Sequence, residues 1–224
     1  MTSVEQSKTE GKLLRRRQVL VPTWRGWLVL LAGFVVLAII AIHEIHPFLA
    51  VNAPLPGGVM VVEGWAPDQA LSNAVAEFRR NHYDRMYITG GPIEAGAPLS
   101  EYQTYAARGS AILQKLGMLT NEIQAVPAPW VRQDRTYTAA LSLANWLRAG
   151  GVRPTEINLI TEDTHARRSR LLYRKALGSG VKIGVTAMPP QDYDPRRWWR
   201  SSVGVRSVIG ETIAYGYARL FFWP

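Results

Sequence analysis

The pattern of apolar and polar positions divides the chain into one long apolar segment and a series of short alternating segments. Residues 26–42 carry no charge and are almost wholly apolar, a run that with its neighbours is long enough to cross a bilayer core of about 30 Å. After residue 58, short apolar runs typical of strands alternate with segments that repeat apolar residues every three or four positions, as helices do. The pattern predicts one membrane helix followed by an α/β domain.

Five short apolar runs predict strands, at residues 59–62, 85–89, 123–126, 156–160 and 181–185. Helices are predicted between and after them, at about 67–81, 100–116, 134–147 and 163–177, with a last helical segment at 195–222. Ser100 and Gln103 form a capping box at the second helix, and Asp134 is the expected cap of the third. Because strands that alternate with helices pair in parallel, we expect a Rossmann-like three-layer α/β domain with a mostly parallel sheet of about five strands, preceded by one transmembrane helix.

The residues that flank the apolar run predict its orientation. Trp24 and Trp27 suit one membrane interface, and arginines stand at positions 15–17 and 25 on the amino side, whereas Glu44 stands on the carboxyl side. By the positive-inside rule, the amino-terminal tail is cytoplasmic and the main domain lies outside. We therefore predict a cytoplasmic basic tail at 1–23, a transmembrane signal-anchor helix at 24–46, a linker at 47–57 and an extracytoplasmic domain at 58–224, in an inner or plasma membrane.

Two other interpretations of the apolar run stay open. One is a signal peptide cleaved near Ala53, although Pro54 follows that position; the other is a buried helix of a soluble protein. His43 and His46 also have a spacing that could hold a metal ion, but polar residues at a membrane interface are the commoner finding. We predict an uncleaved anchor in contact with the lipid bilayer and no metal site.

Composition narrows the functional classes. The 224 residues include no cysteine, which excludes thiol catalysis, disulfides and cysteine-bound metals. The formal net charge is +9, but no zinc-finger or RNA-binding aromatic motif accompanies it, so we predict no nucleic-acid partner. The first predicted strand is followed by Glu63 to Pro67 rather than a glycine-rich dinucleotide motif, and no Walker A motif occurs. We therefore predict no nucleotide and no other cofactor.

The candidate site residues follow the predicted strands or begin the helices after them. They are Glu63, Gly90, Gly91, Glu101, Thr136, His165 and Arg168. Carboxyl ends of parallel strands meet at one edge of a sheet, where ligands usually bind, so we expect these residues around one cleft.

The residue types indicate acid–base chemistry beside an anion. Glu63 and His165 are the predicted catalytic residues, because burial can raise the pKa of a carboxylate and histidine titrates near neutrality. Arg168 stands one helical turn after His165 and has the donor geometry for a phosphate. Gly90 and Gly91 can let a backbone approach a ligand closely.

Each assignment has a structural alternative. Glu63 can instead be an ion-pair partner for Arg135 or Arg168, and the glycine pair can be a plain tight turn. Glu101 can serve only the helix dipole, and Thr136 and His165 can make structural hydrogen bonds. The pair at positions 198–199, two tryptophans among arginines, can pack in the core or meet a membrane surface or a sugar ring.

Several of these residues stand in spaced motifs. The motifs are Thr89-Gly90-Gly91, Ser100-Glu101, Thr136 after Gln133-Asp134-Arg135, Thr161-x-x-x-His165-x-x-Arg168, and a late helical Glu211. In this order they make residues 59–217 resemble the SanA/ElyC/YdcF family, a domain family of largely undefined biochemistry. Arg135 and Ala139 depart from it, since both positions are often asparagine there.

The resemblance implies a role in cell-envelope biogenesis. It suggests a partner that is a phosphate-bearing small molecule or lipid-linked precursor, including polyprenyl-linked ones, without supplying a reaction. Two hypotheses follow. The domain is a hydrolase or transferase acting at a phosphate group, or it is a non-catalytic module that binds such a precursor or scaffolds envelope enzymes.

Overall fold

The computed structural model describes residues 20–93 and 101–224, which form part of two compact units, Met1–Ala41 and Ile42–Pro224. Most of the predicted basic tail, at residues 1–19, and the predicted cap Ser100 lie outside the described residues.

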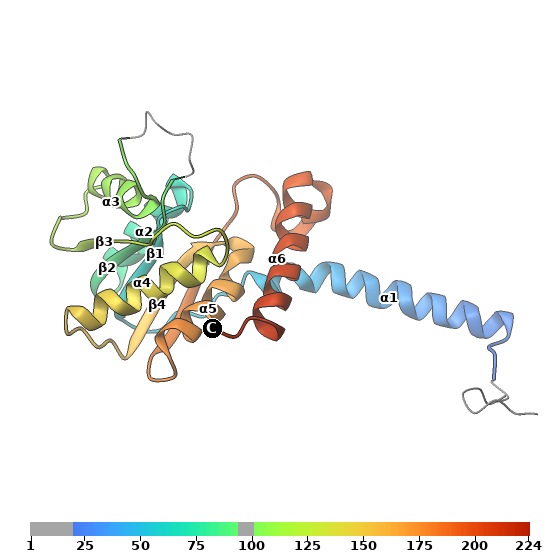
Figure 1. The fold of residues 1–224 in the computed structure, drawn as a ribbon. Helices are drawn as coiled ribbons and strands as arrows, with labels where there is room; N and C mark the ends of the chain where they lie inside the picture. Colours follow the sequence, from blue (N-terminus) through green and yellow to red (C-terminus); the bar gives the residue numbers. More distant parts are fainter. Residues whose placement is uncertain (1–19, 94–100) are drawn as a thin grey trace, which may run out of the picture. The chain divides into compact units, whose positions relative to one another are not determined.

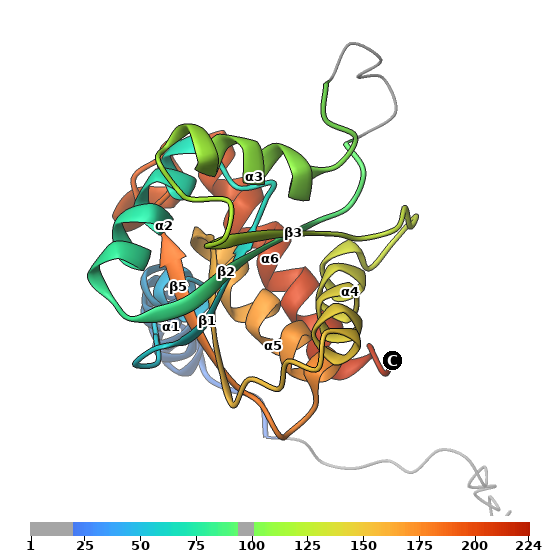
Figure 2. The ribbon, with the colours of Figure 1, turned by 90° about the vertical axis from the view of Figure 1, so that its left-hand side faces the viewer.

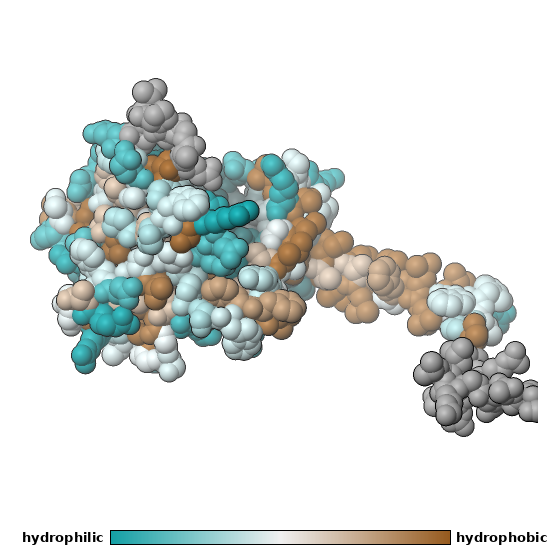
Figure 3. Space-filling view, viewed as in Figure 1, coloured by the Kyte–Doolittle hydropathy of each residue, from teal (hydrophilic) through white to brown (hydrophobic). Residues whose placement is uncertain are grey.

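Helix α1 (Trp24–Leu49) carries the long apolar run of the chain. It is long and apolar enough to cross a membrane, and no residue of its most apolar 18-residue window is buried. Figure 3 shows the apolar surface along much of this helix. A signal sequence has the same length and composition, so α1 is a candidate membrane span by these two properties.

The second unit is built on a five-stranded parallel sheet. The strands are β1 (Gly58–Glu63), β2 (Tyr83–Gly90), β3 (Ile123–Pro127), β4 (Glu156–Glu162) and β5 (Lys182–Met188). Their order is β3-β2-β1-β4-β5, and every neighbouring pair is parallel, which confirms the predicted α/β fold (Figures 1 and 2). The chain proceeds outward in opposite directions from β1, so the order reverses beside that strand, a place where open α/β sheets form a crevice.

Helices cover both faces of this sheet. They are α2 (Asp68–Arg80), α3 (Tyr105–Lys115), α4 (Arg135–Ala149), α5 (Ala166–Leu177) and α6 (Ser202–Leu220), with short 3₁₀ helices η1 (Asp163–His165) and η2 (Pro195–Arg200). Helices α2 and α3 pack on one face and α4 and α5 on the other, while α6 packs against α5 (Figure 2).

Strand β1 shows how the sequence produces this sandwich of layers. Met60 and Val62 belong to the core under α2 and α3, whereas Val59 and Val61 belong to the core under α4 and α5. Successive side chains of a strand point to opposite faces, so a continuous apolar run fits a strand that is covered on both sides. All four residues are at most 5% exposed, as expected for a central strand.

The segment before β1 is fastened to the sheet rather than free. The buried side chain of Asn158 accepts a hydrogen bond from Leu55 N at 2.7 Å and donates to Leu55 O and Gly57 O at 2.9 and 2.8 Å. Ala53 forms an isolated antiparallel bridge with Val185 of β5. The predicted linker therefore leads into the domain along defined contacts.

One predicted helix start and one predicted capping hydrogen bond are wrong. Helix α3 begins at Tyr105, where the hydroxyl oxygen of Thr104 accepts a hydrogen bond from Ala107 N at 3.1 Å, and not at Ser100. Asp134 does precede α4, but its side chain makes no capping hydrogen bond. Its φ of 59° is left-handed, whereas a capping side chain reaches the first turn from an extended backbone.

Gly64 provides a test of the packing next to the sheet edge. A Cβ at this position would lie 2.9 Å from the carbonyl carbon of Tyr105, so Gly64→Ala should force β1 and α3 apart. We expect a loss of about 1–3 kcal/mol in the free energy of unfolding, measured by thermal or denaturant unfolding. Gly180→Ala is the matched control, since its Cβ would meet nothing within 4 Å. Equal stability of the two variants would contradict this packing.

Candidate functional site

A cavity of about 1000 Å³ opens at the carboxyl edge of the parallel sheet. Its wall comes from the ends of β1 and β2, the β3–α4 loop, η1, α5, α6 and the residues after α6. Six predicted site residues line it, namely Glu63, Gly90, Gly91, Thr136, His165 and Arg168. The topology explains the convergence, because the carboxyl ends of parallel strands share one edge. Their chemical roles stay predictions.

Glu101 is the predicted residue that this cavity does not include. It is exposed and is not among the lining residues. Because α3 begins only at Tyr105, Glu101 lies in the irregular segment before the helix, and its expected place in the first helical turn is wrong.

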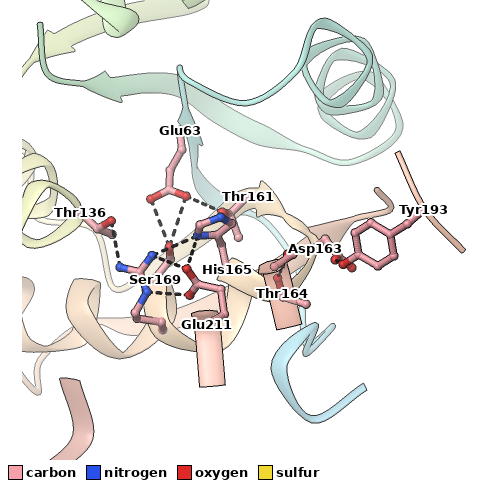
Figure 4. Close-up of polar contacts among 11 residues, drawn as sticks. Glu63, Thr136, Thr161, Asp163, Thr164, His165, Ser169, Tyr193 and Glu211 are labelled. Atoms are coloured by element: carbon pink, nitrogen blue, oxygen red, sulfur yellow. Dashed lines mark hydrogen bonds and ion pairs between the residues drawn. The ribbon is translucent and has the colours of Figure 1, made fainter. Parts of the chain in front are cut away.

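Glu63 is a buried carboxylate at the end of β1, only 2% exposed. The hydroxyl of Thr161 donates a hydrogen bond to Oε2, and the hydroxyl of Ser169 lies 3.2 Å from Oε1 and 3.3 Å from Oε2 (Figure 4). Thr161 is near because β4 pairs with β1. The carboxylate therefore sits among neutral hydroxyl donors.

This environment favours the protonated form of Glu63. Burial raises the pKa of its carboxyl group, while the Thr161 hydrogen bond, the charges of His165 and Arg168 and the Ser169 hydrogen bond only partly oppose the rise. A carboxylic acid with a raised pKa can hold and deliver a proton closer to neutrality than an exposed glutamate can.

A second carboxylate, Glu211 of α6, has the opposite environment. Arg168 donates two hydrogen bonds to Glu211, from Nε to Oε2 at 2.7 Å and from Nη2 to Oε1 at 2.9 Å. His165 Nδ1 lies 3.0 Å from the same Oε1. Burial alone would raise the pKa of Glu211, but the hydrogen bonds and charges of His165 and Arg168 outweigh it and lower the pKa to about 2.

The guanidinium of Arg168 is therefore largely occupied. Besides Glu211 it contacts His165 Nδ1 from Nη2 at 3.0 Å and donates to the hydroxyl of Thr136 from Nη1 at 3.4 Å. Burial lowers the pKa of this guanidinium, but hydrogen bonding to Glu211 and the nearby carboxylates raise it overall. Arg168 stays charged, and Glu211 balances its charge.

These contacts fix the ring of His165. Its Nδ1 is held between Glu211 and Arg168, and its ring packs edge-on against Trp65 with centroids 4.8 Å apart. The Nε2 atom is the ring nitrogen left for a ligand or a proton. Figure 4 shows the His165 ring between the carboxylates of Glu63 and Glu211.

Behind Glu63 lies a further buried hydroxyl pair. Tyr173 of α5 is fully buried, and its hydroxyl lies 2.8 Å from the hydroxyl of Thr89. Burial, together with the charge of Glu63, raises the pKa of Tyr173, so its hydroxyl remains a neutral hydrogen-bonding group. This pair supports the floor of the cavity from inside the sheet.

The outer wall of the cavity differs in character from the floor. Aromatic residues line it on two sides, Trp130 from the β3–α4 loop and Tyr217 and Phe222 from α6 and the segment after it. Arg132 also lines it, is exposed, and has no hydrogen bond or ion pair within residues 20–93 and 101–224. The polar floor and the wall, which carries aromatic residues and an arginine, together suit a ligand with one polar end and one apolar end.

A separate polar cluster lies beside the site, around Asp163, the first residue of η1. Asp163 is 4% exposed, and its Oδ1 lies 2.9 Å from His46 Nε2 without hydrogen-bond alignment, while Tyr193 donates a hydrogen bond to Oδ2. The hydroxyls of Thr164 and Ser207 lie 2.7 Å apart. His46 therefore connects the carboxyl end of α1 to the segment that carries His165.

No group of three or more histidine, aspartate or glutamate side chains that could hold a metal ion occurs among the described residues. The polar groups of the cavity floor instead bond to one another. The arrangement can transfer protons and hold a polar group of a ligand.

Sequence reasoning assigned no role in the site to four of its residues. Glu211 had a signal, since it was recognised as a late helical glutamate of the motif series, and Thr161 begins the motif that contains His165. Ser169 and Arg132 had none, because a serine within a basic helix and an arginine in a loop are common on surfaces.

Comparison with models of protein families and with curated proteins finds no match for this chain.

The buried ion pair predicts a pH-dependent stability. The low folded-state pKa of Glu211 means that its stabilising effect is present above its ordinary value of 4.5 and is lost as the pH falls towards 2. Glu211→Gln, which leaves Arg168 buried and unpaired, should lower the free energy of unfolding by roughly 2–4 kcal/mol at pH 7 and by much less near pH 2.5.

Glu156→Gln is the control for this measurement, because Glu156 pairs with the exposed Lys182 at the surface. Surface pairs contribute about 0–1 kcal/mol, so this variant should unfold like the wild type. If the two variants lose equal stability at pH 7, the buried pair does not hold α6 to α5.

The raised pKa of Glu63 predicts a pH dependence of the free energy of unfolding that is opposite in sign to that of Glu211. Its raised pKa means that stability is fully present below its ordinary value of 4.5 and is lost as the pH rises through the folded-state pKa. Glu63→Gln cannot ionise, and the hydroxyls of Thr161 and Ser169 can rotate to meet its amide. Denaturant unfolding from pH 4 to 8 should show this variant gaining stability relative to the wild type as the pH rises. A constant difference would mean that the carboxyl is not perturbed.

Proposed function

We propose that this protein is a membrane-anchored enzyme that acts on a phosphate-bearing precursor of the cell envelope. The observation that carries the proposal is the placement of Glu63 and His165 on one cavity, where Glu63 is buried among hydroxyl groups and His165 Nδ1 lies 3.0 Å from Glu211 Oε1. A buried carboxyl group and an imidazole that reach the same ligand can act as proton donor and proton acceptor in one reaction.

The chemistry follows from these environments. In hydrolysis, a water molecule attacks phosphorus and loses its proton to Nε2 of His165, whose other nitrogen is fixed by Glu211 and Arg168. The protonated carboxyl of Glu63 supplies a proton to the leaving oxygen, so the phosphate–oxygen bond breaks without release of a strong base. Transfer to an alcohol acceptor uses the same two steps, with the alcohol in place of water.

Arg132 is the better candidate than Arg168 for holding the phosphate. A ligand that paired with Arg168 would compete with Glu211, whereas Arg132 has no ion-pair partner among the described residues and lines the same cavity. Arg168 then has the role of orienting His165 and contributes one remaining Nη1 donor to the ligand. The proposal therefore keeps the phosphate ligand that the sequence predicts but assigns its main contact to Arg132 instead of Arg168.

The location of the domain outside the membrane and the envelope precursor as its substrate are parts of the same proposal. Helix α1 serves as an uncleaved anchor with a cytoplasmic amino terminus, and the domain works on the outer side of the membrane, as the positive-inside rule favours. The resemblance to the SanA/ElyC/YdcF family supports an envelope precursor, including a polyprenyl-linked one, as the substrate.

A non-catalytic module is the second candidate. The polar groups of the floor are mutually satisfied, and no metal-binding group occurs among the residues that the structure describes. Such a site can bind a phosphate-bearing precursor, or scaffold envelope enzymes, without turning the precursor over.

Phosphate release from a prenyl pyrophosphate by the purified full chain separates these candidates. If the protein is an enzyme, His165→Ala and Glu63→Gln should each reduce the rate by about 10²–10⁴, the usual contribution of general acid–base catalysis. Arg132→Ala should weaken binding about tenfold, measured as an increase in KM or Kd, because a charge-assisted contact is lost.

Arg153→Ala is the matched control for Arg132, as an exposed arginine outside the cavity lining. It should bind and react as the wild type does. Binding of the pyrophosphate without any release would establish the non-catalytic module. Unchanged binding by Arg132→Ala would remove the anion role from this residue.

A further inference from the structure

Helix α6 exposes an apolar stripe on the side away from the cavity. Ile209, Ile213 and Leu220 are 49%, 69% and 63% exposed, and spacings of four and seven residues place them on one face of the helix. Glu211 and Ala218, both buried, mark the face directed at the site. We call the three exposed residues the α6 stripe. A soluble surface gains nothing from such a row, so it indicates a contact surface.

The inner side of α6 packs on the carboxyl end of α1. Val208 joins Leu49 in one buried cluster, Val205 and Ile45 pack against it, and the rings of Tyr215 and Phe48 lie 5.7 Å apart. All these residues belong to the unit that begins at Ile42. The α6 stripe therefore lies on a helix that packs against residues 45–49, at the carboxyl end of α1.

Element η2 adds interfacial residues at the same place. Trp198 donates a hydrogen bond from Nε1 to Ile42 O at 2.9 Å, and the ring of Trp199, 38% exposed, lies 5.0 Å from the ring of His43. Tryptophan is enriched where a protein meets the headgroup region of a bilayer.

Three exposed arginines of η2 surround these rings, at positions 196, 197 and 200, and we call them the η2 arginines. The acidic residues nearby are Glu44, Asp192 and Asp194, of which Asp194 caps η2 by accepting a hydrogen bond from Arg196 N at 2.9 Å. Within the element itself the charge is positive, and long arginine side chains can reach anionic headgroups while apolar neighbours enter the interface.

We propose that the α6 stripe, Trp199 and the η2 arginines form a second membrane contact, which lies on a bilayer surface with anionic phospholipid headgroups. The occupant follows from the adjacency to α1 and from the charge of η2. This inference rests on the proposal that α1 spans the membrane, and it adds that the domain is held against the bilayer rather than tethered at a distance.

The absence of cysteine from the sequence makes a spin-label experiment direct. Single-cysteine variants of the full chain, Ile213→Cys in the stripe, Ser179→Cys in the exposed α5–β5 turn and Val36→Cys in α1, are labelled and reconstituted in bilayers that contain phosphatidylglycerol. Collisions with oxygen, which concentrates in lipid, and with a water-soluble nickel chelate report the surroundings of each label. Matching unfolding curves confirm that the variants are folded.

We expect the labels at positions 213 and 36 to favour oxygen and the label at 179 to favour the chelate. A label at 213 that behaves like the one at 179, while position 36 favours oxygen, would overturn this contact and leave the anchor intact. Chelate access at position 36 would refute the anchor and this inference with it. Dipolar broadening between labels at 213 would show that a second copy covers the stripe, which also overturns the proposal.

Lipid charge tests the η2 arginines. In bilayers of phosphatidylcholine alone, the label at 213 should shift towards the chelate relative to phosphatidylglycerol bilayers. Replacing the η2 arginines by alanine should produce the same shift in phosphatidylglycerol, whereas Arg153→Ala should not. Identical accessibilities in all four samples would refute recognition of anionic headgroups.

Discussion

The ion pair between Arg168 and Glu211 is the interaction on which the second half of the domain depends. It joins α5 to α6 through two hydrogen bonds at positions 43 residues apart in the chain. Removing both charges from water is costly, and the doubled contact with a bidentate geometry offsets that cost. Because α6 supplies one wall of the cavity and packs on the last turns of α1, this pair aligns the site, the last helix and the carboxyl end of α1.

The same pair explains why two glutamates of one site differ. Glu211 faces an arginine and a histidine and stays ionised, whereas Glu63 faces hydroxyl groups in a fully buried position and resists ionisation. The sequence does not show that the pKa values of the two carboxyl groups shift in opposite directions. Both are single glutamates beside apolar residues, and their partners lie far away in the chain. The ring of His165 interacts with both carboxyl groups, so an imidazole lies near a carboxylic acid that can donate a proton and beside a carboxylate with a fixed negative charge.

The sequence predicted the fold well because its signals are local. Apolar runs and turn residues located all five strands and the helices between them, and parallel pairing then brought Glu63, Gly90 and His165 to one edge. Helix starts were less predictable, since the cap at Thr104 accompanies backbone contacts between residues 91–93 and residues 103–105 that no local pattern indicates. The partner of Arg168 could not be derived, because the sequence also allowed Glu63 as its ion-pair partner, and only packing places Glu211 of α6 against it.

The electrostatic balance of the cavity also limits what its ligand can be. Arg168 and Glu211 cancel, and Glu63 favours its neutral form, so the described floor offers little net attraction to an anion. On the wall, Arg132 and Arg135 contribute positive charge beside Asp134, and solvent weakens the charge of Arg132 until a ligand covers its guanidinium. A small free anion would leave that charge hydrated. A larger ligand that also covers the aromatic wall at Tyr217 would exclude water, strengthen the contact with Arg132 and bury its own apolar part beside α6, so a ligand with an anionic end and an apolar end fits this cavity better than an inorganic phosphate does.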